Sequence, residues 1–252
     1  MAVLLAGFVW IELNSADPLV RLGVFRLGAL TRANIGAMTL FGSYVSFQFL
    51  VTQYLQTLNG WSALSTALAF LPAGVMVAVL STRMGSIIDR FGTARVTVIA
   101  FACLVAGYAV FLQIGTRPDY PAVIMPAVLL IGLAFGLGFS SLSLAATAGV
   151  PDAEQGLAAS LFQTSFQVGG AIVLAIVTAV VDAGGANQVL SAQATLGAYR
   201  PALAVITGVS ALGAITALTA LRPARRRSAA PELVAVIPEQ AERAPAGVAC
   251  ED

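Results

Sequence analysis

The fold is decided by the stretch RMGSIIDRFGTAR, residues 83–95, a short charged loop between two long apolar runs. It holds three arginines and one aspartate: Arg83, Arg90, Arg95 and Asp89. The other charged residues between positions 33 and 221 are few: Arg117, Asp119, Asp152, Glu154, Asp182 and Arg200. The side of a membrane on which this loop lies therefore sets the side of every other segment.

The composition is that of a protein with several membrane spans. The chain is 58% apolar and 10% charged, against about 45–50% and about 25% in soluble domains. Its mean hydropathy is +0.89 over 252 residues. Histidine is absent, which excludes His-ligated haem, His-ligated zinc and His general bases. Cys103 lies in an apolar run and Cys250 in a polar tail, so we expect neither a disulfide nor a redox role.

Six apolar runs predict six transmembrane helices. Each is long enough to cross a hydrocarbon core of about 30 Å, and inside lipid a helix satisfies its own backbone polar groups. The runs lack the alternating pattern of a membrane barrel. We therefore predict an all-α integral membrane fold, preceded by a partial helix. The predicted spans are 34–57, 62–81, 94–115, 122–147, 157–181 and 201–221.

The remaining segments are predicted to lie outside these spans. Residues 1–11 are apolar but shorter than the ~20 residues that a span needs, so we interpret them as the remnant of a truncated membrane helix; a short interfacial helix is the alternative. Residues 12–33 are predicted to be a cytoplasmic linker and 222–252 a disordered cytoplasmic tail. The triplet Arg225–Arg227 is expected to anchor the last helix at anionic headgroups, with a lipid-specific or regulatory site as the alternative.

The arginines predict the orientation. If six spans alternate, the segments 12–33, 82–95, 148–156 and 222–252 share one side. They hold all but Arg117 and Arg200 of the 13 basic residues. The positive-inside rule then places the 83–95 loop and the C-terminus in the cytoplasm. We expect a multi-pass protein of the cell membrane.

Residue types and spacing in the loop indicate a mechanical role. Gly85 is expected to allow close helix packing, and Gly92 suits a turn or a helix C-cap that needs a positive φ. Asp89 is expected near the start of the following helix, where the dipole favours a carboxylate. Arg90 and Arg95 would then form a charge network with it. The alternative is a loop that is basic only because cytoplasmic loops are basic.

The spacing Gly85-x-x-x-Asp89-Arg90-x-Gly92-x-x-Arg95 resembles the cytoplasmic signature between the second and third helices of each half of the major facilitator superfamily. Other stretches resemble its fourteen-helix drug:proton antiporter branch. These are FVWIE (8–12) with ADPLV (16–20), YLQ (54–56) with GWSAL (60–64) and LAFLP (68–72), and GVP (149–151) with GLAAS (156–160). The resemblance implies that 34–221 is the C-terminal six-helix lobe of such a transporter, and that the loop is a conformational latch.

The resemblance also implies what this lobe does not supply. Thr93 and Ala94 stand where the family usually has Arg or Lys, so the latch is expected to be weaker. The family's antiporter signature and its proton-carrying acids belong to the N-terminal lobe. No Asp or Glu falls in the middle of a predicted span here. Protons are therefore expected to pass through the missing lobe.

Neutral residues are the candidates for substrate contact. Ser160, Gln163, Thr164 and Gln167 fall on one helical stripe, which either lines a cavity or hydrogen-bonds to another helix. Tyr44 and Gln48 share a face with Phe41 that either meets an amphipathic substrate or packs. The small residues Gly132, Gly136, Gly138, Gly169 and Gly170 are expected to allow close helix approach.

Together these features predict the C-terminal portion of a proton-coupled multidrug or small-molecule efflux transporter that works by alternating access. A non-transporting fragment and a half-transporter that pairs with a separate N-terminal lobe are the alternatives. An integral membrane enzyme is a remote one, because the spans hold no nucleophile–base pair. The expected partners are the lipid bilayer and a small amphipathic substrate. No cofactor, metal, catalytic residue or nucleic acid is expected.

Overall fold

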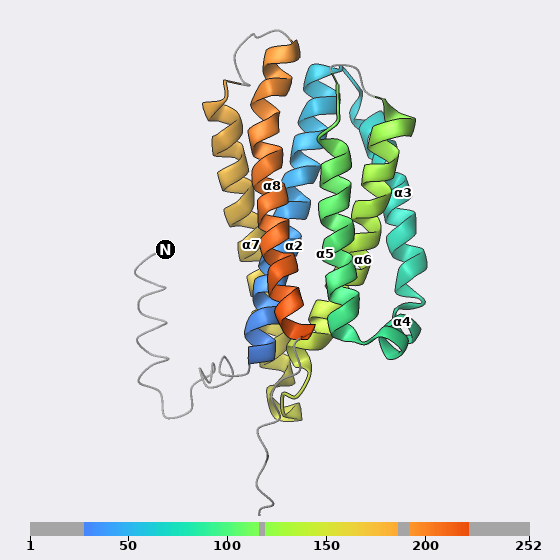
Figure 1. Ribbon diagram of the computed structural model, residues 1–252, viewed down its shortest axis with the longest axis vertical. Helices are drawn as coiled ribbons and strands as arrows, with labels where there is room; N and C mark the ends of the chain where they lie inside the picture. The colour runs from blue at the N-terminus through green and yellow to red at the C-terminus, as the bar shows by residue number, and fades with distance from the viewer. Residues whose placement is uncertain (1–27, 116–118, 186–191, 222–252) are drawn as a thin grey trace, which may run out of the picture. The chain divides into compact units, whose positions relative to one another are not determined.

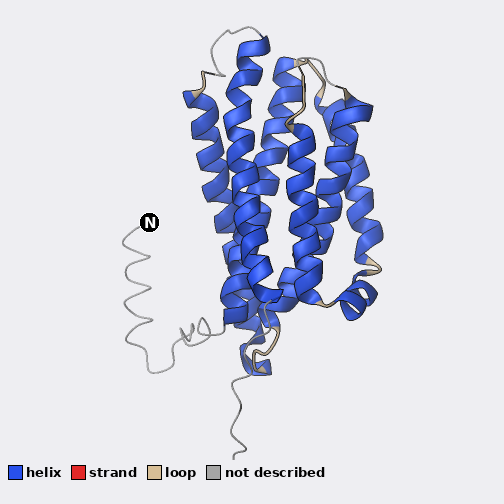
Figure 2. Ribbon diagram, in the orientation of Figure 1, coloured by secondary structure: helices blue, strands red, loops and turns tan. Residues whose placement is uncertain are grey.

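A computed structural model describes residues 28–115, 119–185 and 192–221, and all of its regular elements are helical (Figures 1 and 2). The prediction of an all-α fold with six long apolar helices is confirmed: within the described ranges, six helices are long and apolar enough to cross a membrane. The α-helices are α2 (Gly28–Gln53), α3 (Ala63–Ser81), α4 (Met84–Phe91), α5 (Thr93–Phe111), α6 (Met125–Thr147), α7 (Gln155–Ala183) and α8 (Ala192–Leu221).

Helix ends differ from the predicted spans in places. The helix α2 begins at Gly28, inside the segment predicted as linker. The last helix begins at Ala192, nine residues before the predicted start, so Arg200 lies within α8 and not in a loop. The described part of the chain excludes residues 1–11, most of the linker and the 222–252 tail. The predictions for those segments lie outside the described residues.

The helix α2 is the centre of the bundle. It packs against α6, α7 and α8, while α5 packs against α6 and α8, and α3 makes its main contact with α6. Figure 1 shows α3 and α7 on opposite edges of the bundle, with α2 between them. This arrangement leaves α3 largely uncovered, and a line of its apolar side chains is exposed: Leu64, Leu68, Leu71, Val75 and Val79. In a membrane such a line faces lipid or another protein surface.

Small residues bring the helices close together, as predicted. A Cβ on Gly132 of α6 would lie 2.8 Å from the Cα of Ala73 on α3. A Cβ on Gly169 of α7 would overlap the backbone of Met38 on α2. Between helices in lipid, close backbone approach and van der Waals contact are the main source of association. These glycines therefore fix the distances of α3 and α7 from the centre.

Aromatic rings and a hydrogen bond between side chains connect the helices in the interior. Phe47 of α2 lies with its ring centroid 5.0 Å from that of Tyr108 and 4.9 Å from that of Phe111, both on α5. A buried hydrogen bond of 3.0 Å runs from the hydroxyl of Thr97 on α5 to the Oγ of Ser141 on α6. These contacts connect α5 to α2 and to α6.

Two tyrosines brace the end of the bundle opposite α4. Each belongs to a π-helical turn, Tyr54–Leu58 after α2 and Tyr120–Ile124 before α6. The hydroxyl of Tyr54 donates to the carbonyl of Gly115 at 2.8 Å. The hydroxyl of Tyr120 donates to the carbonyl of Ala69 on α3 at 3.2 Å. Four helices are thus linked at this end by side-chain hydrogen bonds and short turns.

Candidate functional site

Six aromatic rings from α2, α6 and α7 form one continuous cluster. Phe41 stacks on Phe166 with centroids 4.0 Å apart, and Tyr44 lies 4.4 Å from Phe135. The chain of contacts continues from Phe135 to Phe166 and Phe139, and from Phe139 to Phe162. Phe162 and Phe166 are buried, while Phe139 is exposed. The cluster therefore begins in the core and ends on the surface of the lobe.

Four of these rings were not predicted from the sequence: Phe135, Phe139, Phe162 and Phe166. Each pair is spaced i, i+4 on its helix, which places both rings on one face. That spacing was a usable signal for an aromatic face on each helix. The meeting of the two faces on α2 is a matter of tertiary packing, which spacing along one helix does not reveal.

Tyr44 and Gln48 line a common hollow. It has a volume of about 240 Å³, and its other walls include Phe70 and Gly74 of α3 and Ile131 of α6. Tyr44 is half-buried and Gln48 is exposed. The side-chain amide of Gln48 has no hydrogen-bond partner among the described residues. This amide is therefore available to water or to a ligand in the hollow.

The predicted polar stripe on α7 is on the surface. Ser160, Gln163, Thr164 and Gln167 are all exposed. Two of the four side chains hydrogen-bond to the backbone of their own helix. The Ser160 hydroxyl donates to the carbonyl of Leu157 at 2.8 Å, and the Thr164 hydroxyl donates to the carbonyl of Ser160 at 2.9 Å. Within the described ranges, the amides of Gln163 and Gln167 bond to no other group. The stripe is thus not used for packing inside this lobe.

The aromatic cluster links the two groups of candidates. Gln163 and Gln167 follow the buried Phe162 and Phe166 directly in the chain. The ring of Phe166 is also 6.2 Å from that of Phe135, on which Tyr44 packs. Along α7 each free amide therefore follows a ring of the cluster, and on α2 Gln48 lies one turn after Tyr44. Exposed rings and free amides can bind an amphipathic molecule by ring contact and neutral hydrogen bonds.

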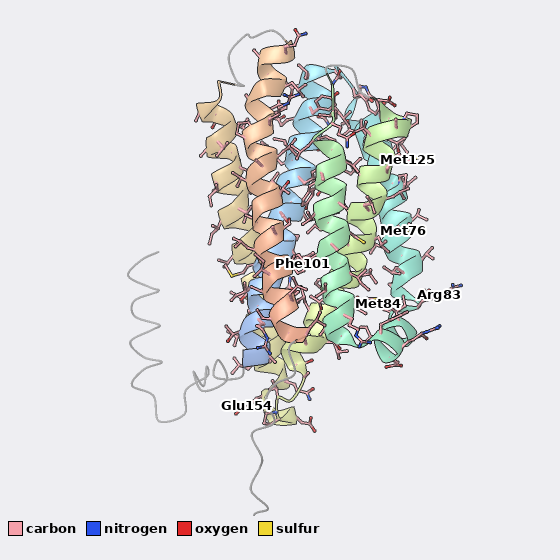
Figure 3. The ribbon with its side chains drawn as sticks, viewed as in Figure 1. Met76, Arg83, Met84, Phe101, Met125 and Glu154 are labelled. Atoms are coloured by element: carbon pink, nitrogen blue, oxygen red, sulfur yellow. The ribbon has the colours of Figure 1, made fainter. Side chains whose placement is uncertain are left out.

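The charged stretch 83–95 is mostly helical and not a loop. Residues Met84–Phe91 form the eight-residue helix α4. Its apolar side chains explain why it forms: Met84, Ile87 and Ile88 pack against Leu80, Val96 and Leu137. Figure 3 shows Arg83 and Met84 at the same end of the bundle as Glu154. The polar residues Asp89, Arg90 and Arg95 are exposed.

The two glycines of this stretch have different surroundings. Gly92 ends α4 and precedes α5 with φ of 80°, a conformation that favours glycine, as predicted. The expectation for Gly85 was wrong, because a Cβ there would meet nothing within 4 Å. Gly85 does not bring helices together in this lobe, since its side of α4 faces outward.

The charges of α4 are not paired with one another. Asp89 lies in the last turn of α4, three residues before Gly92 at the start of α5. No salt bridge joins it to Arg90 or Arg95 among the residues that the structure describes. The guanidinium of Arg90 lies 5.6 Å from the centre of the Phe91 ring instead. A charge network around Asp89 therefore needs a partner outside these residues.

The described carboxylates all lie in α4 or at helix ends: Asp89, Asp119, Asp152, Glu154 and Asp182. Asp119 accepts from the backbone N–H of Ala122 at 3.1 Å, and Asp152 accepts from the side chain of Gln155 at 2.9 Å. Within the described ranges no three carboxylates or thiols gather closely enough to hold a metal ion. Away from their ends, the described spans therefore carry no carboxylate.

Comparison with known proteins decides the family. The family model described as "Major Facilitator Superfamily" matches residues 4–174. The chain belongs to the Major Facilitator Superfamily. This is a family of membrane transporters, so the alternative of a membrane enzyme is excluded.

Curated relatives in the superfamily are resistance proteins. The chain is 31% identical over 232 residues to the puromycin resistance protein pur8 of Streptomyces alboniger, covering 85% of this chain and 45% of that protein. It is 28% identical over 182 residues to the multidrug resistance protein Stp of Mycobacterium tuberculosis, covering 72% and 34%. It is 28% identical over 198 residues to the lincomycin resistance protein LmrB of Listeria monocytogenes, covering 76% and 40%. The chain thus spans less than half the length of each.

Proposed function

We propose that this chain is the C-terminal lobe of a proton-coupled efflux transporter of the fourteen-helix type, which exports small amphipathic molecules by alternating access. The observation that carries the proposal is the set of exposed neutral groups on α2, α6 and α7, namely the free amides of Gln48, Gln163 and Gln167 and the ring of Phe139. The names of the relatives support an export role, since they include puromycin, lincomycin and multidrug resistance. The motifs in residues 8–20, 54–72 and 149–160 support the fourteen-helix assignment.

In this proposal the lobe supplies one wall of the substrate cavity. Transporters of this kind bind substrate between two lobes near the membrane midplane and expose it by rocking one lobe against the other. The wall is neutral: Gln48, Gln163 and Gln167 contribute amides, and Phe139 contributes an exposed ring. A neutral aromatic wall favours flat amphipathic compounds without selecting one charge pattern. Broad specificity follows from that chemistry.

The proton pathway is assigned to the other lobe. Intramembrane ionisable residues are the usual proton relays, and the described carboxylates of this chain lie in α4 or at helix ends. Proton movement through the other lobe would therefore drive the movement of this lobe, and no residue within the spans of this lobe would bind or release the proton.

The α4 segment is proposed as the latch of the cytoplasmic side. Its hydrophobic face holds it against α3, α5 and α6, while Asp89 and the arginines remain exposed. In one conformation these charges would pair with the opposite lobe, and rocking would separate them. This assignment explains why Asp89 has no ionic partner within the described part of the lobe.

A half-transporter that assembles with a separate N-terminal lobe is the second candidate. In that candidate a second chain would supply the part of the transporter that this chain does not match in its relatives. The two readings predict different DNA upstream of the first codon. An in-frame sequence coding for further apolar helices supports one long transporter, and a start site beside a second half-length gene supports the pair.

Export is tested in bacterial cells that lack their own efflux pumps. The reading frame with its in-frame upstream sequence, or the chain with the neighbouring half-length gene, is expressed and loaded with ethidium. We expect efflux that stops when a protonophore collapses the proton gradient, and increased resistance to puromycin or lincomycin. Efflux that continues unchanged without the gradient would contradict proton coupling, and absence of efflux from a correctly inserted protein would contradict export.

A further inference from the structure

A second cavity lies away from the proposed substrate surface. It is lined by residues of α2, α5, α6 and α8 and has a volume of about 180 Å³. Its lining includes Arg32, Thr93, Thr97, Phe101, Leu142 and Ala217. Figure 3 shows Phe101 in the half of the bundle nearest the α4 end. The cavity shares no residue with the hollow that Tyr44 and Gln48 line.

The inside of this cavity is apolar. Phe101, Leu142 and Ala217 are buried, and alanines from all four helices make up much of the remaining wall. The Thr97 hydroxyl is already bonded to the carbonyl of Thr93 at 2.9 Å, and that of Thr216 to the carbonyl of Gly213 at 2.8 Å. The cavity is much larger than the about 10–15 Å³ that one water molecule needs, but its apolar walls disfavour water. The space suits a hydrocarbon chain.

The mouth of the cavity is positively charged. Arg32 of α2 is exposed there and has no acidic partner among the described residues. Thr93 and Ala94 bring the N-terminus of α5 to the same lining. The cap residue of α5 is Gly92, so no side chain caps its free N–H groups. A helix N-terminus with free N–H groups attracts phosphate, and the lining contains no carboxylate to oppose it.

We propose that this cavity binds one anionic phospholipid, with an acyl chain inside and its phosphate between Arg32 and the N-terminus of α5. The choice of a lipid follows from the combination of an apolar interior with a positive mouth. The position along the membrane normal also fits, because Arg83 lies at this end of the bundle, with Arg90 in α4 and Arg95 in the first turn of α5, and such arginines lie at headgroup level. The site is distinct from the proposed substrate surface and does not depend on export activity.

The test uses the 252-residue chain, purified in detergent and examined by native mass spectrometry. Dioleoylphosphatidylglycerol is compared with dioleoylphosphatidylcholine, which has the same acyl chains without net charge. We expect one tightly held phosphatidylglycerol per chain and weaker retention of phosphatidylcholine. Arg32→Gln should weaken phosphatidylglycerol binding about fivefold, the effect of one basic residue near a headgroup. The matched control Arg200→Gln, at an exposed arginine near the opposite end of α8, should not change it.

Filling the cavity separates this site from general lipid adhesion. Ala145→Leu and Ala220→Leu each place a larger side chain at a half-buried lining position, and either should abolish the preference for phosphatidylglycerol. Ala211→Leu, at a half-buried position of α8 outside the lining, is the control. Circular dichroism confirms that each variant is folded. Equal retention of both lipids, an unchanged preference in both folded filling variants, or displacement by inorganic phosphate or oleate would each overturn the proposal.

Discussion

Phe41 of α2 stacks on Phe166 of α7, with ring centroids 4.0 Å apart and 19° between the ring planes. The contact joins the central helix to an edge helix, and Phe166 directly precedes Gln167 of the polar stripe. A Cβ on Gly170 of α7 would lie 2.8 Å from the Phe41 ring, so the ring is held on two sides. The stack thus positions Gln163 and Gln167 relative to the aromatic cluster.

Removing this ring should loosen α7. Phe166→Ala deletes a buried side chain that contacts four other rings, and such truncations cost about 3–5 kcal/mol. The free energy of unfolding is measured by denaturant titration of the chain in micelles. Val168→Ala, at an exposed position of the same helix, should change it by only about 0.5 kcal/mol. Equal effects of both variants would contradict the packing described here.

Close approach between α2 and α7 should make Gly169 intolerant of a side chain. Gly169→Ala forces a Cβ against the Met38 backbone, and we expect a loss of about 1–3 kcal/mol in the free energy of unfolding. Gly208→Ala on α8 is the matched control, since a Cβ there meets nothing within 4 Å. That control should be stabilised by up to about 1 kcal/mol through helix propensity. A neutral Gly169→Ala would show that the two helices lie further apart.

The two glycines around α4 should respond differently to alanine. Gly92 has φ of 80°, so Gly92→Ala should cost about 1–2 kcal/mol in the free energy of unfolding. Gly85→Ala adds a methyl group to open space inside a helix and should be neutral or slightly stabilising. Limited proteolysis near residue 92 gives a second measurement of local opening. A larger loss of free energy of unfolding in Gly85→Ala than in Gly92→Ala would mean that Gly85 is the packed glycine of the pair.

The latch proposal predicts a defect in transport without a defect in folding. Asp89 is exposed, so Asp89→Asn should leave the unfolding transition unchanged while slowing efflux by the whole transporter. The reason is that its charge would act only against the opposite lobe in one conformation. Initial rates of ethidium efflux are compared at equal amounts of inserted protein. Asp152→Asn, another exposed acid, is the control, and a normal rate in Asp89→Asn would reject the latch.

The sequence predicted the parts of this fold that depend on local composition. The lengths of the apolar runs were enough to predict six spans. The preference of glycine for positive φ was enough to predict the conformation of Gly92. The glycines of α6 and α7 were expected to lie at helix contacts because small residues allow close approach, and Gly132 and Gly169 do so.

Other features depend on which helices meet. The helix α4 was missed because eight residues between Arg83 and Gly92 are short for a helix, and its stability comes from packing on Leu80, Val96 and Leu137. The packing role expected for Gly85 was wrong because sequence spacing does not show which side of α4 faces the bundle. The ring of Phe139 and the cavity at Arg32 arise from three or four helices meeting, and no single stretch of sequence encodes them.

The most direct test of the central claim is whether the α7 stripe faces a water-filled substrate path. Gln167→Cys and Ile172→Cys are made on exposed positions of α7, with Cys103 and Cys250 replaced by serine. Both are labelled in intact cells that carry the whole transporter, using a small membrane-impermeant maleimide.

If the stripe lines the path, Gln167→Cys will be labelled much faster than Ile172→Cys, and an exported substrate will slow its labelling. Equal labelling rates at the two positions, with no protection by substrate, would contradict the assignment of this face to the transport path.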